Sequence, residues 1–335
     1  MIKNNHRIMA SILLCSLFFT ACSKSQDSAV QSKTEDAVAL TDALGREYLP
    51  AEKIESVVPL DYSFAEIVCL VGGKDKITGL GRVRDTSPIL QRYLPSQSEL
   101  PVTGRKNSLN IEKLLSIKPD LVLCGSYSSV VDLIAENGIT VFALPLSSTI
   151  EESIDYIGLI GRCIGNPGEA AVLTSYLYEI LSMVEDKTKK IDDSERPGIY
   201  YARDSLYETM DNDFQSGVIA SAGGINTAAD SNSNNFTIEV SRENIYKWNP
   251  EIIIIRANSP LTVEEVYADR EFSNLNAVLN KKVFKLKYAE AEYGLEAVFG
   301  ILEKALIFHP EIFKDTDMEK TVEGFYKKVD SFYSS

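Results

Sequence analysis

The sequence predicts an α/β protein with two Rossmann-like lobes, each built on a mostly parallel sheet, joined by one long helix. From about residue 40, short β-rich runs alternate with amphipathic stretches, which is typical of βαβ units. Residues 149–192 show helical patterns and no convincing strand, and the alternation resumes after residue 193. We therefore expect an N-terminal lobe over 41–165, a connecting helix within 166–192 and a C-terminal lobe over 193–335.

The composition is that of an ordinary globular protein. Of 335 residues, 44% are hydrophobic and 24% are charged, which excludes wholesale disorder. The formal net charge is −14, so the phosphate backbone of a nucleic acid would repel the chain. We expect no nucleic-acid partner.

The first 40 residues have the pattern of a secretory signal and a linker. Lys3 and Arg7 precede an apolar run from Met9 to Phe19, which is too short to span a bilayer. Thr20-Ala21-Cys22 follows and resembles a bacterial lipoprotein cleavage site, with Phe19 where that pattern usually has leucine. We expect a signal over 1–21, lipidation of Cys22 and a flexible polar tether over 22–40. The alternative is an ordinary signal cut a few residues later.

The N-terminal lobe should contain four strands separated by helices. Gly138 should end one of these helices, because glycine favours the residue after a helix. The expected strands are Ile54–Leu60, Ile77–Gly81, Leu121–Cys124 and Thr140–Leu144, and the expected helices are Ser63–Val71, Asn110–Ile117 and Ser129–Asn137.

Two helices should link this lobe to the next one. Thr149–Ile164 reads as one helix, Asn166-Pro167-Gly168 as a break, and Glu169–Ile191 as a second helix about 34 Å long. The C-terminal lobe should hold strands at Gly198–Ala202, Ile252–Arg256 and Val283–Leu286, with helices at Phe214–Ala222, Arg242–Lys247 and Val263–Ala268 and a helical pair within 295–332.

Side chains for the common enzyme mechanisms are missing. Beyond the predicted signal the sequence has one histidine, His309, and it has no HExxH, GxSxG or GxxxxGK[ST] motif. Cys69, Cys124 and Cys163 lie in apolar segments without metal-ligand spacing, so we expect small buried side chains rather than a disulfide or zinc site. We expect no catalytic residues, no resident metal and no cofactor.

Several blocks, in order, resemble the substrate-binding proteins of bacterial ABC importers for iron-siderophores, haem and vitamin B12. The blocks are TDALGREYLP, IESVVPL with AEIVCLVGGKDKITGL, LNIEKLLSIKPDLVLCG, SAGGINTAAD with VSRENIYKWNPEIIII, and FHPEIF. The resemblance covers about residues 41–315 and implies two lobes on a helical backbone. It also implies a permease and its ATPase as partners. ATP hydrolysis must come from that ATPase, because this chain has no P-loop.

Two glutamates stand out within these blocks. Glu112 and Glu243 each lie early in a predicted helix, seven residues before a Pro-(Asp/Glu) pair that starts a strand. In the family, glutamates at these positions dock on arginines of the membrane subunits, and the resemblance implies that role for both. The alternative is a carboxylate favoured by the helix dipole.

Ligands of open α/β sheets bind beyond the carboxyl ends of the strands. Arginines there can fork onto anionic oxygens, and tyrosines offer flat faces to aromatic or macrocyclic ligands. The candidate ligand residues are Tyr62, Arg82, Arg84, Arg105, Tyr127, Arg203, Arg256 and Tyr288.

We therefore expect a monomeric, lipid-anchored extracytoplasmic protein that captures a metal chelate for an ABC importer and performs no covalent chemistry. A lone histidine argues against a bare-metal site, and the arginines favour a ferric siderophore over cobalamin. Haem and a nickel chelate stay open. The rival from another class is an extracytoplasmic chelate-processing enzyme.

Overall fold

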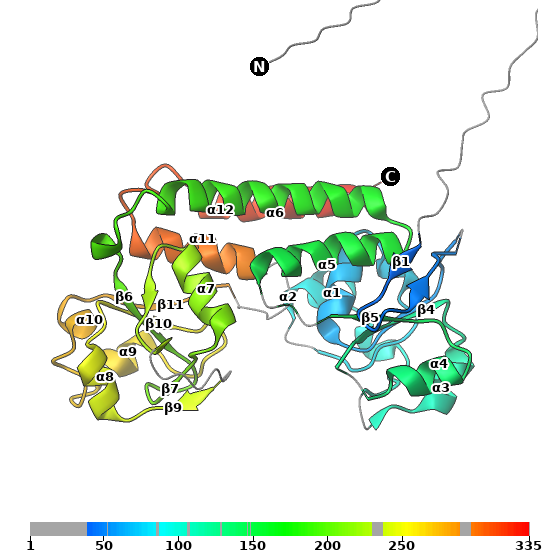
Figure 1. Ribbon diagram of the computed structural model, residues 1–335, viewed down its shortest axis with the longest axis horizontal. Coiled ribbons are helices and arrows are strands. Elements are labelled where there is room, and N and C mark those ends of the chain that lie inside the picture. Colours follow the sequence, from blue (N-terminus) through cyan, green and yellow to red (C-terminus); the bar gives the residue numbers. More distant parts are fainter. Residues whose placement is uncertain are drawn as a thin grey trace, which may run out of the picture. The chain divides into compact units, whose positions relative to one another are not determined.

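The computed structural model describes residues 39–51, 53–84, 87–105, 108–127, 129–145, 147, 149–229, 237–288 and 296–334. The predicted signal and Cys22 lie outside these residues, as does the predicted tether up to residue 38. Residues 37–335 form one compact unit. Within it, two separate parallel sheets and a long helix confirm the predicted fold class (Figure 1).

The N-terminal sheet has three parallel strands in the order β3-β4-β5. These are Val57–Pro59, Leu121–Gly125 and Val141–Leu144, and every residue in them is buried. Burial on both faces explains why the strands read as unbroken apolar runs. A short antiparallel pair, β1 (Leu40–Thr41) with β2 (Glu47–Tyr48), precedes this sheet.

The predicted strand at Ile77–Gly81 is wrong, because only isolated bridges form there, from Ile77 to Val57 and from Leu80 to Val102. The carbonyls of Val57 and Pro59 accept from Thr78 and Gly81, so this segment runs along the free edge of β3. Pro59 has no N–H to donate back, and three residues here oppose two in β3. A regular ladder therefore cannot form.

The helices of this half are close to their predicted positions. Asn110 is the N-cap of α3 rather than its first residue and accepts from the Lys113 amide, and Gly138 follows α4 with φ of +75°. The one helix without a prediction, α2, begins at Pro88 behind the capping Ser87. The elements are α1 (Tyr62–Leu70), α2 (Pro88–Tyr93), α3 (Ile111–Ile117), α4 (Val131–Glu136) and α5 (Ile150–Cys163), with short 3-10 turns at Lys74–Lys76 and Gln97–Glu99.

The long helix α6 runs from Pro167 to Thr188. Pro167 is its first residue, where a missing N–H costs nothing, rather than part of a break before it. The helix packs against α5 from the N-terminal half and against α7, α11 and α12 from the C-terminal half. It therefore belongs to the cores of both halves.

The C-terminal sheet has four parallel strands in the order β11-β10-β6-β8. They are Val283–Lys285, Ile252–Ile255, Gly198–Ala202 and Ile225–Asn226. An antiparallel pair joins β7 (Glu208–Thr209) to β9 (Ile238–Glu239). The helices are α7 (Asp213–Ser221), α8 (Arg242–Trp248), α9 (Val263–Ala268), α10 (Asn276–Leu279), α11 (Glu296–Phe308) and α12 (Met318–Ser331), with a 3-10 turn at Asp193–Glu195.

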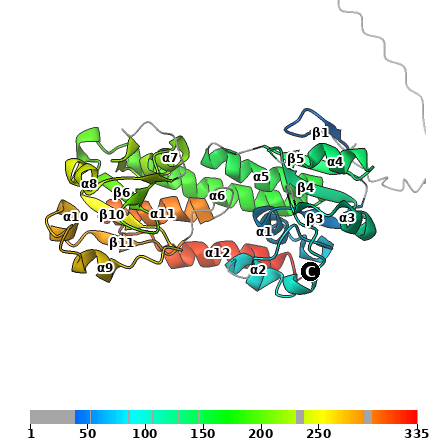
Figure 2. The same ribbon diagram turned by 90° about the horizontal axis from the view of Figure 1, so that it is seen from below.

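The last helix, α12, returns to the N-terminal half, which the sequence pattern did not predict. Asp330 accepts from Tyr93 Oη at 2.9 Å and pairs with Arg92 at 2.6 Å, both on α2 (Figure 2). The Tyr333 hydroxyl donates to the carbonyl of Cys69 at the end of α1. The halves are thus linked by α12 as well as by α6.

The three cysteines of the described chain are buried and form no disulfide, as expected. His309 Nε2 lies 3.0 Å from the carbonyl oxygen of Gly223, a structural contact. Across the residues described here, no three His, Cys, Asp or Glu side chains come together as a metal site. In the same residues no helix combines the length and apolarity that crossing a membrane requires.

Candidate functional site

Tyr62, Arg82 and Arg84 come together beyond the carboxyl end of β3. The guanidinium carbons of Arg84 and Arg82 lie 4.1 and 4.7 Å from the centroid of the Tyr62 ring. Both distances are within cation–π range. The three predicted residues therefore form one aromatic and cationic surface.

Arg105 and Tyr127 join this group through a residue that was not predicted, Asp61. Arg105 Nη1 donates to Asp61 Oδ1 at 2.5 Å, and the Tyr127 hydroxyl donates to Asp61 Oδ2 at 2.9 Å. Asp61 directly precedes α1 and is mostly shielded, with 13% of its side chain exposed. Its position directly before Tyr62, after a strand, is the sequence signal that could have located it.

The charges of this N-terminal cluster, which we define as Asp61, Tyr62, Arg82, Arg84, Arg105 and Tyr127, are unbalanced. Burial, together with the nearby Arg105 and Arg84 guanidinium groups, lowers the pKa of Arg82, although Tyr62 and Asp61 oppose the effect. Arg82 Nε is buried and has no hydrogen-bond acceptor within the described chain. The cluster thus holds three guanidinium groups and one carboxylate, so it can accept further anionic oxygens.

Glycines let the backbone bring these side chains close. A Cβ on Gly81 would lie 2.0 Å from the Leu60 carbonyl oxygen. The segment leading to Arg82 can therefore run this close to the end of β3 only because residue 81 is glycine. A Cβ on Gly125, the last residue of β4, would lie 2.3 Å from the Tyr127 ring. The ring folds back over the strand end because that glycine has no side chain.

A buried glutamine fixes the backbone at Arg84. Gln97, which is 3% exposed, accepts from the Arg84 amide at 3.1 Å and donates to the Arg84 carbonyl at 3.4 Å. One turn into α1, buried Glu66 accepts from Ser87 at 2.5 Å. Burial raises the pKa of Glu66, against the effect of Ser87 and the nearby Arg84, so this carboxyl compensates the arginines poorly.

In the C-terminal half, Arg203 and Arg256 follow adjacent strands. Arg256 Nη2 pairs with Asp204 Oδ1 at 2.8 Å, and the Arg256 amide donates to the carbonyl of Ala202. Burial raises the pKa of Tyr201, at the end of β6, while Arg256 and Arg203 oppose the rise, so both cations lie near this ring. The C-terminal cluster, defined as Arg203, Asp204 and Arg256, is smaller and closer to neutral.

Tyr288 lies apart from these arginines in its contacts. Its ring centroid is 6.0 Å from that of Phe299 on α11, and its amide donates to Glu303 Oε2 at 3.2 Å. The ring therefore packs partly into the core. The structure does not bring Tyr288 into the C-terminal cluster.

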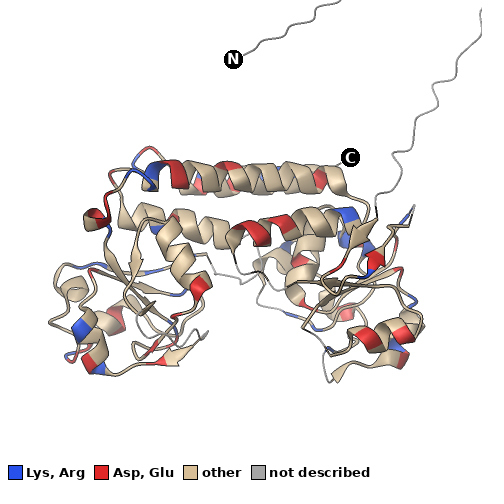
Figure 3. Ribbon diagram, viewed as in Figure 1, with Lys and Arg blue, Asp and Glu red and all other residues tan. Residues whose placement is uncertain are grey.

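Glu112 and Glu243 occupy the same place in two similar helices. Each is the second residue of a seven-residue helix, α3 or α8, and each is exposed. Acidic residues, red in Figure 3, are scattered over both halves of the chain. Glu243 lies 3.7 Å from Arg242 Nη2, and Arg242 also pairs with Glu271 at 3.3 Å. Among the described residues Glu112 has no ion pair.

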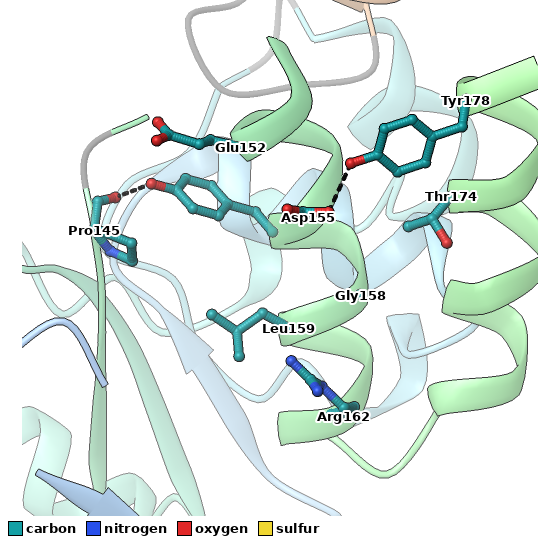
Figure 4. A pocket seen from close by; sticks show the side chains of 9 residues that line it. Pro145, Glu152, Asp155, Gly158, Leu159, Arg162, Thr174 and Tyr178 are labelled. Carbon is teal, nitrogen blue, oxygen red and sulfur yellow. Dashed lines mark hydrogen bonds between the residues drawn. The ribbon is translucent and has the colours of Figure 1, made fainter. Parts of the chain in front are cut away.

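A hollow that is separate from these side chains lies between α5 and α6 (Figure 4). Its volume is about 570 Å³, and its walls include Glu152, Asp155, Leu159 and Tyr178. The Tyr178 hydroxyl donates to Asp155 at 2.7 Å and thereby ties the two helices together. None of the predicted ligand residues lines this hollow, and its mixed charges suit no one ligand class.

Comparison with known sequences gives one family and several relatives. The model of a family described as periplasmic binding protein matches residues 57–289. The molybdate-binding protein MolA of Haemophilus influenzae is 26% identical, with 96% of this chain and 95% of that protein covered. The ABC transporter substrate-binding lipoprotein YvrC of Bacillus subtilis is 26% identical over 93% of this chain and 100% of that protein. The Fe(3+)-citrate-binding protein YfmC of Bacillus subtilis is 25% identical over 83% and 87%.

Solved structures share the fold. A periplasmic solute binding protein of Veillonella parvula superposes with a TM-score of 0.75 at 21% identity, over 89% of this chain and 93% of that one. Molybdate-bound MolA of Haemophilus influenzae gives a TM-score of 0.73 at 24% identity, over 89% and 98%. At these identities the likeness concerns the fold alone.

Proposed function

The chain belongs to the periplasmic binding protein family, and from that premise we propose that it captures an anionic metal complex, a ferric siderophore above all, for an ABC importer. The N-terminal cluster is the observation that carries this proposal. Arg82 and Arg84 lie over the Tyr62 ring, and Arg105 and Tyr127 both donate to the one carboxylate of the cluster, Asp61. Such a surface suits a ligand with several anionic oxygens on a flat organic frame.

The C-terminal cluster supplies a second, weaker set of donors. Arg203 and Arg256 follow strands whose carboxyl ends lie side by side in one sheet. The pairing of Arg256 with Asp204 leaves less surplus charge here than in the N-terminal half. The ligand's charge is therefore bound mainly by the N-terminal cluster.

Related proteins are named for different ligands: molybdate, Fe(3+)-citrate and, in a relative from Halobacterium salinarum, cobalamin. Molybdate and Fe(3+)-citrate are anions, which agrees with an arginine-rich site. Cobalamin, haem and a nickel chelate are the alternatives. A chelate-processing enzyme is disfavoured, because these relatives are named as binding proteins.

We propose that Glu112 and Glu243 bind the permease, through which the chain meets its ATPase, and that the chain acts as a monomer. Their matched positions on two exposed helix starts support this role. We also propose that Cys22 carries lipid and holds the chain outside the cytoplasm, on the periplasmic or cell-surface side of the membrane. The relative named as a lipoprotein supports the anchor, and loss of labelled palmitate in Cys22→Ser tests it.

A thermal unfolding panel tests the ligand. The purified chain is heated with ferric catecholates, ferric citrate, molybdate, haem, cyanocobalamin and nickel–histidine. A ligand at about 100 times its Kd adds about 2.7 kcal/mol, which raises Tm by a few degrees. Arg84→Ala should lose the rise, whereas Arg162→Ala, on exposed α5 surface, should keep it. A panel with no rise overturns the proposal, and consumption of a chelate by the chain alone indicates the enzyme.

A further inference from the structure

Asp61 uses its carboxylate in an unusual way for its place in the chain. It holds the N-cap position of α1, where an aspartate normally accepts from the second or third amide of the helix. Asp61 makes no such bond, whereas Asp317, at the N-cap of α12, accepts from the Lys320 amide at 3.0 Å. The α1 start thus gives up a stabilising contact, and the carboxylate serves another purpose.

That purpose lies in the N-terminal cluster. One oxygen of Asp61 accepts from Arg105 and the other from Tyr127, so a single carboxylate is held by a cationic donor and a hydroxyl donor. This is the contact that an anionic oxygen of a ligand would make with the same two side chains. The carboxylate of Asp61 therefore takes the place that an anionic oxygen of the ligand would otherwise take.

The rest of the cluster stays short of negative charge. Arg82 interacts with Arg105 and Arg84 as like charges, and its Nε is buried without an acceptor in the described part of the chain. A ligand that brings one anionic oxygen can meet Arg82 and Arg84 while Asp61 stays in place. A ligand that brings several must either displace Asp61 from Arg105 or lie beside its charge.

We propose that Asp61 determines which ligand charge this site accepts, a role that rests on the proposed binding function. As an internal anion, it satisfies Arg105 and Tyr127 in the empty protein and repels ligands in proportion to their negative charge. Simple anions gain too few contacts to displace it. A large chelate gains enough, because its frame also contacts Tyr62 and the other arginines.

The test measures charge selectivity in Asp61→Asn by titration calorimetry of the full chain. The probes are ferric citrate and molybdate as anions, and cyanocobalamin as a ligand without net charge. The variant should bind the anions about tenfold or more tightly than the native chain, since it removes a competitor for charged hydrogen bonds. Its affinity for cyanocobalamin should change less than about twofold, because an uncharged ligand is not repelled.

Two further variants make the result decisive. Asp61→Glu keeps the negative charge, so its affinity for simple anions should be as weak as that of the native chain. If the role of Asp61 were purely structural, the affinities of Asp61→Glu would be altered as much as those of Asp61→Asn. Asp317→Asn changes an equivalent N-cap far from the arginines and should leave all affinities as they were. Circular dichroism checks that each variant is folded.

The outcomes separate this inference from the proposed function. The inference is supported if only Asp61→Asn, and not the native chain, binds the anions. It is also supported if both bind and the variant binds them about tenfold or more tightly. If the native chain binds the anions and Asp61→Asn binds them equally or more weakly, the role of Asp61 is overturned while the proposed function stands. If neither protein binds ferric citrate or molybdate, the inference fails, and the unfolding panel with ferric catecholates decides the proposed function separately.

Discussion

The segments Asn110–Gly125 and Ser241–Ile255 are built alike, although they belong to different halves. Each begins with a capping side chain, continues through a seven-residue helix with one fully buried residue, Leu114 or Ile245, and ends in a buried parallel strand. In each, the residue after the helix is left-handed, with φ of 55° at Lys118 and 40° at Asn249. A proline then directs the chain into the strand.

Their differences are as informative. Asn249 tolerates a left-handed backbone better than Lys118 does, and its side chain also accepts from the Asn276 amide at 3.0 Å. Glu243 has a cation on its own helix, Arg242, whereas Glu112 has no ion pair in the described chain. The backbone plan is thus shared between the halves, and the surface chemistry is not.

The largest effect that should follow from the shared plan is on transport. Glu112→Arg with Glu243→Arg should abolish uptake of the ligand, because like charges would meet at the proposed permease contact. Ligand affinity should stay within a few fold, since neither residue belongs to the ligand clusters. Uptake in cells carrying the importer, with affinity measured on the purified variant, checks both.

The single variants sharpen the comparison. Glu112→Arg should impair uptake more than Glu243→Arg, because Arg242 already offsets part of the charge of Glu243. Glu136→Arg with Glu264→Arg, exposed acidic residues on α4 and α9, supplies the same change in net charge as a control. Full uptake by the docking double variant would refute the assignment.

The halves also bury opposite ionisable groups. Burial raises the pKa of Glu66 in the N-terminal half, so its support of the fold weakens as the pH rises through the pKa it has in the folded chain. In the C-terminal half, Lys304 of α11 is fully buried, and burial lowers its pKa from 10.5 to about 7. Between those two values the unfolded chain binds more protons than the folded one.

Stability should therefore rise with pH above about 7 on account of Lys304, and this group should contribute no slope below that value. The slope cannot exceed about 1.4 kcal/mol per pH unit. Lys304→Met should remove it and raise the free energy of unfolding at pH 7 by a few kcal/mol, on the order of the lost desolvation cost. Urea unfolding at pH 6.5, 8 and 9.5 measures the difference. Equal slopes in both proteins would show that Lys304 is not buried uncharged.

Much of this arrangement could be predicted from local pattern. The strands at Leu121, Gly198 and Ile252 are short apolar runs that start after turn or proline signals, and their length together with those signals locates them. The prediction of a strand at Ile77–Gly81 was wrong because Pro59 of the neighbouring strand has no N–H to donate. That residue lies too far along the chain to show in the local pattern. The return of α12 to α2 depends on Asp330 meeting Tyr93, and no local pattern encodes that contact.

The candidate site divides in the same way. Arginines after strand ends are visible in the sequence, and the structure joins three of them with two tyrosines. Asp61 was missed because its role appears only when Arg105 and Tyr127, from two other loops, reach it. Tyr288 lies apart from the arginines because its ring packs near Phe299 on α11, and its part in ligand binding stays a prediction.

The smallest predicted effect concerns the acidic residue that follows each proline. Asp120 Oδ2 accepts from two amides before β3, those of Glu55 at 2.8 Å and Ser56 at 2.9 Å. Glu251 Oε1 accepts from one amide of β6, that of Gly198, at 3.2 Å. Both carboxylates fasten the start of their own strand to the start of its neighbour.

Asp120→Ala should lower the free energy of unfolding by about 1–2 kcal/mol, and Glu251→Ala by about half as much, because the first loses two charge-assisted bonds and the second one longer bond. Urea unfolding at pH 7 measures both, with Glu136→Ala as the matched exposed control. Losses no larger than that of Glu136→Ala would mean that the strand starts are held by their backbone ladders alone, and equal losses above that control would mean that the two carboxylates contribute alike. A larger loss at Glu251 would reverse the comparison and make the C-terminal sheet the more dependent on its carboxylate.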